Sequence, residues 1–218
     1  MKIKLFKQKT FAVVPTIWGW LLIFAVFTLG VYGAITRCGL FLSKDKPVSA
    51  SVLVVEGWAP DYALVKAAHE FRDGHYALLV ATGGPLENGM FLSEYKTWAQ
   101  LAGATFKKLG VDTNALVILP SPKVRADRTY AAACRVRAWI QRSSGPITSI
   151  NLFSVGAHTR RSGLLYRQAL GKNIVVGTIC CPDKEYDVRK WWTSSQGFRT
   201  VADECIAYFY ARFIFSAH

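Results

Sequence analysis

His158 and Arg161, three residues apart, are the side chains of this sequence best suited to proton transfer and anion binding. They follow an apolar run, and a spacing of three residues at the start of a helix lets both side chains face the same cleft. A lone histidine usually makes only a local hydrogen bond, but a histidine beside an arginine can also transfer a proton or contact a phosphate. The pair predicts a functional site in which His158 is catalytic and Arg161 binds the ligand.

A second candidate lies where the segment Arg125–Thr129 opens another expected helix. Asp127 can cap this helix, and Arg128 and Thr129 occupy its first turn, where free backbone N–H groups attract anions. A guanidinium group at that position adds a charged donor that can form bidentate hydrogen bonds with a phosphate or a carboxylate. We therefore expect Arg128 and Thr129 to bind an anionic ligand.

Two further candidates follow another apolar run. Gly83 and Gly84 come directly after it, and glycines let backbone N–H groups approach a ligand closely, although turn geometry alone explains such a pair equally well. Ser93 and Glu94 stand at the expected start of the next helix, where a serine caps the helix and a glutamate suits its dipole. We expect Gly83, Gly84 and Ser93 to contact the ligand, and Glu94 is one carboxylate that can exchange protons with His158.

Several catalytic motifs are absent from the sequence. It contains no Gly-x-x-x-x-Gly-Lys-Ser/Thr loop, no His-Glu-x-x-His helix and no Gly-x-Ser-x-Gly elbow, so P-loop hydrolysis, zincin chemistry and ordinary esterase chemistry are unsupported. None of the five cysteines has the Cys-x-x-Cys spacing of a metal site. Cys134 and Cys205 fall in apolar helical patterns, where we expect buried, inert thiols, and the vicinal Cys180 and Cys181 are too strained to pair easily. We expect neither a metal nor a cofactor.

These candidates are positioned by an alternation of short apolar runs and longer helical patterns. That alternation predicts an α/β fold, Rossmann-like, with helices on both sides of a mostly parallel sheet of about five strands. The expected strands are Ser51–Glu56, Ala77–Thr82, Ala115–Leu119, Ser149–Ser154 and Ile174–Ile179, and the expected helices are Asp61–Arg72, Leu92–Lys108, Asp127–Gln141, Thr159–Leu170 and Gly197–Phe215. Ligands of such sheets bind outside the carboxyl ends of the strands, which is where most of the candidates fall.

The N-terminal part of the chain predicts a membrane anchor. Phe11–Ile35 contains no charged residue and, as a helix, reaches about 37 Å, more than a hydrocarbon core of about 30 Å requires. The residues before Arg37 offer no good small-x-small cleavage site, so we expect an uncleaved single-pass helix rather than a signal peptide. The chain then divides into a basic cytoplasmic N-terminus (1–10), the anchor (11–36), a linker (37–48) and one α/β domain (49–218).

The distribution of charge bears on orientation and partners. Basic residues before the anchor outnumber those just after it by a narrow margin, at Lys2, Lys4, Lys7 and Lys9 against Arg37, Lys44 and Lys46, which favours a cytoplasmic N-terminus and an extracytoplasmic domain. After residue 37 the chain keeps 22 Lys and Arg against 14 Asp and Glu. This excess suits an anionic surface or ligand, and a solvated basic face explains it equally well. Nucleic acid is not an expected partner, because no nucleic-acid motif is present and the anchor holds the domain at a membrane.

Taken in order, these segments resemble the YdcF-like family, the group that also contains the ElyC and SanA envelope proteins, from about Ser51 to Phe215. The sequence departs from the family pattern at Glu56-Gly57-Trp58, where the family has glycines, at Arg128, where it has asparagine, and at Thr159-Arg160, where it has a hydrophobic residue and proline. The resemblance implies a Rossmann-like domain, tethered by one N-terminal helix on the outer side of the cytoplasmic membrane. The matching steps are Val52–Gly57, Gly74, Thr82-Gly83-Gly84, Ser93-Glu94, Arg128-Thr129, His158–Arg161 and, as a further site residue on the final helix, Glu204.

The resemblance implies a role in cell-wall or surface-polysaccharide metabolism, and the candidate cleft beside an anchor suits a phosphate-bearing ligand that can be lipid-linked. In an enzymatic form, a hydrolase or phosphatase, His158 with Glu94 or Glu204 transfers protons. A non-catalytic ligand sensor or scaffold is one alternative. A nucleotide-cofactor module of the S-adenosylmethionine type is another, but Gly-x-Gly-x-x-Gly is missing and Trp58 occupies the place where a pyrophosphate approaches.

Overall fold

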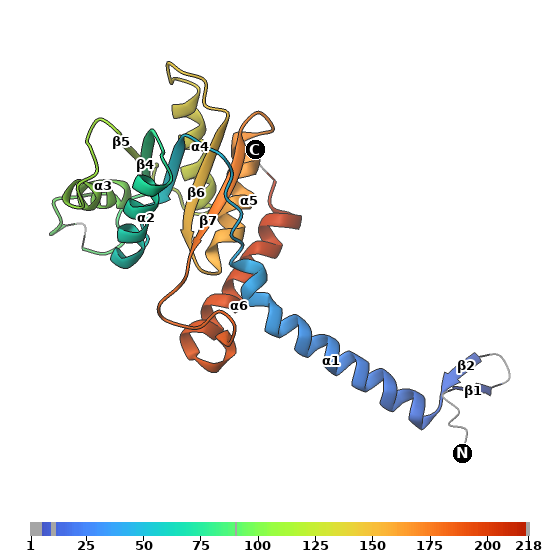
Figure 1. The fold of residues 1–218 in the computed structure, drawn as a ribbon. Helices are drawn as coiled ribbons and strands as arrows, with labels where there is room; N and C mark the ends of the chain where they lie inside the picture. Colours follow the sequence, from blue (N-terminus) through green and yellow to red (C-terminus); the bar gives the residue numbers. More distant parts are fainter. Residues whose placement is uncertain (1–5, 10–11, 90, 217–218) are drawn as a thin grey trace.

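A five-stranded, all-parallel sheet forms the centre of the α/β domain (Figure 1). The computed structural model describes residues 6–9, 12–89 and 91–216. The sheet has the order β5-β4-β3-β6-β7. The central strand β3 begins with a continuous apolar run and is buried on both faces, as the sequence predicts, and β6 beside it is buried along nearly its whole length. The strands are β3 (Val52–Glu56), β4 (Leu78–Gly83), β5 (Leu116–Pro120), β6 (Ser149–Val155) and β7 (Val175–Cys181), each within two residues of the predicted bounds.

Helices cover both faces of this sheet. On one face α2 (Asp61–Asp73) and α3 (Trp98–Lys108) pack into one apolar core, and on the other α4 (Arg128–Ile140) and α5 (His158–Leu170) pack into a second. The result is a three-layer, Rossmann-like α/β arrangement, so the predicted fold class is confirmed.

The order of the strands creates a topological switch point between β3 and β6. The chain starts at the central strand β3 and moves outward to β4 and β5; it then crosses back to β6, on the other side of β3, and ends at β7. The connections after β3 and β6 therefore leave in opposite directions. In open parallel sheets this switch point opens a crevice at the carboxyl ends of the two strands.

Two helix predictions need correction. Helix α3 begins at Trp98 rather than Leu92, because Thr97 and Gln100 form a capping box and a bridge between Pro85 and Thr97 closes the preceding loop. The last helix, α6 (Ser195–Phe209), begins two residues early at its Ser194 cap, and it gives way to a short π-helical segment, Tyr210–Ile214.

Helix α1 (Ile17–Leu42) is long and apolar enough to cross a membrane. It is preceded by a hairpin of β1 (Phe6–Lys9) and β2 (Ala12–Pro15), and the Thr16 side chain caps it by accepting a hydrogen bond from Gly19 N at 3.3 Å. The apolar helix predicted over 11–36 thus lies six residues later, and the linker predicted over 37–48 is helical as far as residue 42. Residues 10 and 11, at the predicted boundary, lie outside the described residues.

The carboxyl end of α1 packs against the α/β domain, while its amino-terminal part projects away from it (Figure 1). Gly39 and Leu42 are buried, and this end of α1 contacts α5 and α6. A small third core forms here, where Leu42 packs with side chains that include Trp191 and Val201. The helix and the domain are therefore joined by packing as well as by the chain itself.

Candidate functional site

Three ionisable side chains meet at the switch point, each brought there by a different element. Glu56 is the last residue of β3, His158 is the first residue of α5, directly after β6, and Glu204 comes from α6. Gly156 makes the turn between β6 and α5 with a φ of 49°, a conformation that favours glycine. The carboxyl edge of the sheet thus carries an acid–base cluster where open α/β sheets bind their ligands.

The imidazole of His158 lies between two carboxylates. Its Nδ1 atom is 2.6 Å from Glu204 Oε1, and its Nε2 atom is 3.9 Å from Glu56 Oε1. We assign the Nδ1 proton to the short hydrogen bond with Glu204, which fixes the ring. The unprotonated Nε2 atom then lies 3.3 Å from Arg161 Nη2, so it can accept a hydrogen bond from the guanidinium group or a proton from a ligand. The Trp58 ring meets the imidazole edge-on, with ring centroids 4.7 Å apart, and restricts its movement further.

Glu204 also binds Arg161 through two parallel hydrogen bonds. Arg161 Nε donates to Oε2 at 2.8 Å, and Nη2 donates to Oε1 at 2.9 Å. Burial alone would raise the pKa of the Glu204 carboxyl, but its hydrogen bonds with His158 and Arg161, and their charges, lower that pKa to about 2. Glu204 is therefore a fixed carboxylate at neutral pH. It positions His158 rather than exchanging protons itself.

Glu56 is the second carboxylate of the cluster and is almost fully buried. Ser154 donates a hydrogen bond to its Oε2 atom at 2.5 Å, and Ser162 donates to its Oε1 atom at 3.0 Å. Burial raises the pKa of the nearby Tyr166 hydroxyl well above its usual value, and the charge of Glu56 adds to that rise. A buried carboxylate held by two hydroxyls thus lies nearest the Nε2 atom of His158, whereas Glu204 binds the Nδ1 atom.

Arg161 connects the cluster to the start of α4. Burial lowers the pKa of Arg161, whereas the hydrogen bonds and charge of Glu204 and the charges of Glu56 and Asp127 raise it, and the net shift is upward. Asp127 precedes α4 in a left-handed conformation, with a φ of 56°. Arg161 Nη1 makes no hydrogen bond to any described residue, so one arm of the guanidinium group is free for a ligand.

The predicted arginine at the start of α4 does not join this cluster. Arg128 forms an ion pair with Glu87, both side chains being largely exposed, and within the described ranges it has no bond to His158 or Arg161. Thr129 lies beside it in the first turn of α4 and is half-buried. The start of α4 therefore approaches the cluster through Asp127 rather than through Arg128.

The glycine pair and the Ser-Glu pair have different positions. Gly83 ends β4, and a Cβ atom there would lie 2.7 Å from Trp98 Cβ, so the packing of α3 requires this glycine. Gly84 follows it at the same edge. Ser93 and Glu94 lie in the loop before α3, where Ser93 Oγ accepts a hydrogen bond from Tyr95 N and Glu94 is exposed, with no bond to the His158 cluster among the described residues.

Of the predicted site residues, the structure brings His158, Arg161 and Glu204 into direct contact. From the sequence, Glu56 was named only as the end of an expected strand and as a departure from the family pattern, although a single charge ending a run of apolar residues was a usable signal. The sequence contained no comparable signal for Ser154 and Ser162, because small polar residues occur throughout the chain. In the part of the chain that the structure describes, no group of three or more His, Cys, Asp or Glu side chains is arranged to hold a metal ion.

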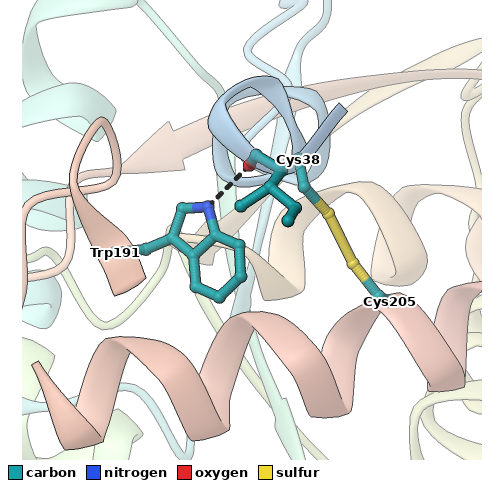
Figure 2. Close-up of a disulfide and its surroundings, with 4 residues drawn as sticks. Cys38, Trp191 and Cys205 are labelled. Carbon is teal, nitrogen blue, oxygen red and sulfur yellow. Dashed lines mark hydrogen bonds between the residues drawn. A yellow bond between two sulfur atoms is a disulfide. The ribbon is translucent and has the colours of Figure 1, made fainter. Parts of the chain in front are cut away.

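A disulfide joins α6, the helix that carries Glu204, to α1. Cys205 follows Glu204 on α6, and its sulfur is bonded to that of Cys38 on α1 (Figure 2). The prediction of a free, inert thiol at Cys205 is therefore wrong. The apolar pattern around Cys205 does mark a packing surface, but the partner across that surface is a second cysteine, on α1. Cys134, Cys180 and Cys181 are free thiols, and burial raises the pKa of the last two.

The sequence matches no protein-family model and no curated protein. The resemblance to the YdcF-like family therefore stays a prediction. Fold and site together define the class of protein: a Rossmann-like α/β domain with a histidine held between two carboxylates at its switch point, bonded to an apolar helix that is long enough to cross a membrane.

Proposed function

We propose that α1 anchors this protein in the cytoplasmic membrane, and that its α/β domain acts on the outer side in cell-wall or surface-polysaccharide metabolism. The proposed ligand bears a phosphate and can be lipid-linked. The observation that carries the proposal is the position of His158: it lies between Glu204 and Glu56 at the switch point, and the residue after Glu204 is bonded to the anchor helix.

The disulfide supports the outer location. Such bonds persist in oxidising compartments and are rare in the cytoplasm. The bond between Cys38 and Cys205 also supports an uncleaved anchor, because it makes α1 part of the folded domain. Orientation with a cytoplasmic N-terminus agrees with the basic residues that precede α1.

The dimensions of α1 support a domain that sits on the bilayer surface. Trp191 Nε1 donates a hydrogen bond to the Ile35 carbonyl at 3.0 Å, so the domain begins to contact α1 near that residue (Figure 2). Residues 17–34 precede this contact and span about 27 Å, close to the thickness of a hydrocarbon core. Trp192, which is only partly buried, then falls at the level where aromatic residues favour the membrane interface.

The exposed face of α6 supports the same arrangement. Phe198, Ile206, Phe209 and Phe213 are each more than half exposed, and their spacing places them along one side of the helix and its π-helical extension. Cys205, which bonds to α1, adjoins this side. An apolar stripe beside the anchor gains free energy when it enters the interface. The edge of the sheet that carries His158 then lies close to the membrane, where a lipid-linked ligand is found.

In the enzymatic form, the cluster supports hydrolysis of a phosphate ester or a phosphoanhydride, such as the terminal bond of a lipid-linked pyrophosphate. His158 Nε2 accepts a proton from a water molecule as its oxygen bonds to phosphorus, the bond to the leaving oxygen breaks, and the imidazolium returns the proton to that oxygen. Arg161 Nη1 offers a donor to the phosphate, and Glu204 keeps the imidazole in position. No additional reactant is needed, since water supplies both the oxygen and the proton.

The non-catalytic alternative has an observation of its own. Two of the three guanidinium nitrogen atoms of Arg161 are already bound to Glu204, an arrangement that also suits a rigid binding or sensing surface. The nucleotide-cofactor alternative is disfavoured by Trp58, whose ring lies against His158 at the mouth of the switch point.

Phosphate release from a prenyl pyrophosphate in detergent micelles, with the purified full chain, tests the proposal. We expect His158→Gln to lower the rate about 100-fold or more, the usual contribution of a proton-transferring residue. His69→Gln, at an exposed histidine on α2, is the matched control and should keep the full rate. Equal rates for His158→Gln and the unmodified protein would refute the catalytic role. Binding of the pyrophosphate without release by either protein would instead establish the sensor alternative.

A further inference from the structure

A second polar surface lies along the outer edge of the sheet, separate from the His158 cluster. It is a groove of about 790 Å³ between β7, α5 and the segment that follows α1. None of the cluster residues lines it, and no Asp or Glu is among the lining residues. Its charged lining consists of five basic residues: Lys44, Lys46, Arg160, Arg167 and Lys172.

These cations lack acidic partners. In the described ranges none of the five forms an ion pair with a carboxylate. Arg160 donates to the Phe41 carbonyl at 3.1 Å, and Arg167 donates to the Val176 carbonyl at 3.4 Å. Burial lowers the pKa of Arg167; Tyr208 partly opposes this shift, and the charge of the neighbouring Arg160 adds to it. An anion in the groove would relieve this repulsion.

The groove starts where the chain leaves the anchor. Lys44 comes two residues after Leu42, the end of α1, and the guanidinium group of Arg160 stacks on the ring of Phe41, 3.6 Å from its centroid. The segment after α1 then runs along the sheet edge, where Lys46 pairs with Thr178 of β7. A ligand that reaches this groove from the end of α1 reaches it from the surface of the bilayer.

The floor of the groove adds an apolar component. Val48, Ile174, Val175 and Val176 line it between the basic side chains, and Val175 is more than half exposed. A surface that combines cations with aliphatic side chains suits a molecule with a charged head and a hydrocarbon part. Free inorganic phosphate would use only the first of these two features.

We propose that this groove binds the phosphate-bearing headgroup of an anionic membrane lipid. The inference rests on α1 spanning a membrane, but it does not depend on any reaction at His158. A bound headgroup would hold β7 and α5 against the bilayer, and thereby fix how the domain stands on its anchor.

Native mass spectrometry of the full chain in mild detergent tests the inference, with phosphatidylglycerol and phosphatidylcholine as the two probes. We expect the protein to retain phosphatidylglycerol in preference to phosphatidylcholine. The triple variant Lys44→Gln, Lys46→Gln, Lys172→Gln changes only exposed side chains and should weaken retention by about 100-fold. The charge-matched control Lys66→Gln, Lys107→Gln, Lys108→Gln alters exposed lysines of α2 and α3, on the opposite layer, and should retain the lipid fully.

Three results would overturn the inference. Equal retention of the two lipids would show that the headgroup charge is not recognised, and an equal loss in the control variant would show a general charge effect. Complete displacement of phosphatidylglycerol by inorganic phosphate at the same concentration would identify a free-phosphate site instead. His158→Gln should leave lipid retention unchanged, so a failure of the proposed reaction and a failure of this site can be told apart.

Discussion

Glu204 and Cys205 are adjacent on α6 but contact different parts of the molecule: the Glu204 carboxylate binds His158 at the sheet edge, and the Cys205 sulfur is bonded to Cys38 of α1. The helix that positions the imidazole is therefore fastened to the helix that is apolar enough to enter a membrane. Arg160 repeats this relationship from α5, since it stacks on Phe41 while its neighbour Arg161 binds Glu204. The geometry of the site and the position of α1 are thus coupled.

The pair of Glu204 and Arg161 should make a measurable contribution to stability. Glu204→Gln leaves the guanidinium group without its charged partner in a largely buried place, so we expect a loss of about 3 kcal/mol in the free energy of unfolding. Urea denaturation of the full chain in detergent, followed by tryptophan fluorescence, measures it. Glu87→Gln removes the partner of the exposed Arg128 and should change stability by less than about 1 kcal/mol. Equal effects of the two substitutions would contradict the described geometry.

The stability of the protein should depend on pH because the pKa of the Glu204 carboxyl differs between the folded and unfolded states. Because the pKa of Glu204 falls from 4.5 to about 2 on folding, its contribution is fully present above pH 4.5 and is lost as the pH falls toward 2. At about 1.4 kcal/mol for each pH unit, that contribution is about 3 kcal/mol. Thermal unfolding of the unmodified protein and Glu204→Gln between pH 6 and pH 2 measures it. A slope that is equally steep in the variant would assign the effect to other groups.

The disulfide should stabilise the domain against unfolding. It closes a loop of 167 residues, and bonds across long loops typically contribute about 2–5 kcal/mol. Cys38→Ser should therefore unfold at lower urea concentration than the unmodified protein, and a reducing agent should bring the unmodified protein to the same midpoint. No effect of the reducing agent on the unmodified protein would show that Cys38 and Cys205 are not bonded in solution.

The two glycines at the end of β4, Gly83 and Gly84, differ in how tightly they are packed. Gly83→Ala places a methyl group against Trp98 at the start of α3 and should cost about 1–3 kcal/mol. Gly84→Ala meets only ordinary contacts, the nearest being Ser121 Oγ at 3.5 Å, and Gly145→Ala meets open space. Both of these should fold with nearly unchanged stability, as measured by the same urea titration. A large loss of stability for Gly84→Ala, without one for Gly83→Ala, would contradict the described packing of the two glycines.

Much of the fold could be predicted because its strands are continuous apolar runs that end at glycine or proline, as in Ala77–Thr82 and Ala115–Leu119. The start of α3 was missed because Ser93-Glu94 and Thr97-x-x-Gln100 are both acceptable helix starts in sequence. Only the bridge between Pro85 and Thr97, which requires the folded loop, selects the second.

The site was only partly predictable for a related reason. The spacing of His158 and Arg161 is local, so sequence alone indicated that they act together. Glu204 was expected only through the family resemblance, because its contact with His158 joins residues 46 apart in sequence. The contact of Glu56 with Ser154 joins residues 98 apart, and the bond of Cys38 to Cys205 depends on how α1 packs against α6.

The central claim is that the His158 cluster lies on the outer side of the cytoplasmic membrane, and topology tests it most directly. Alkaline phosphatase, active only outside the cytoplasm, and green fluorescent protein, fluorescent only inside it in this assay, would each be fused after His218. We predict high phosphatase activity and no fluorescence. Fluorescence without phosphatase activity would contradict the proposed location and, with it, the envelope ligand.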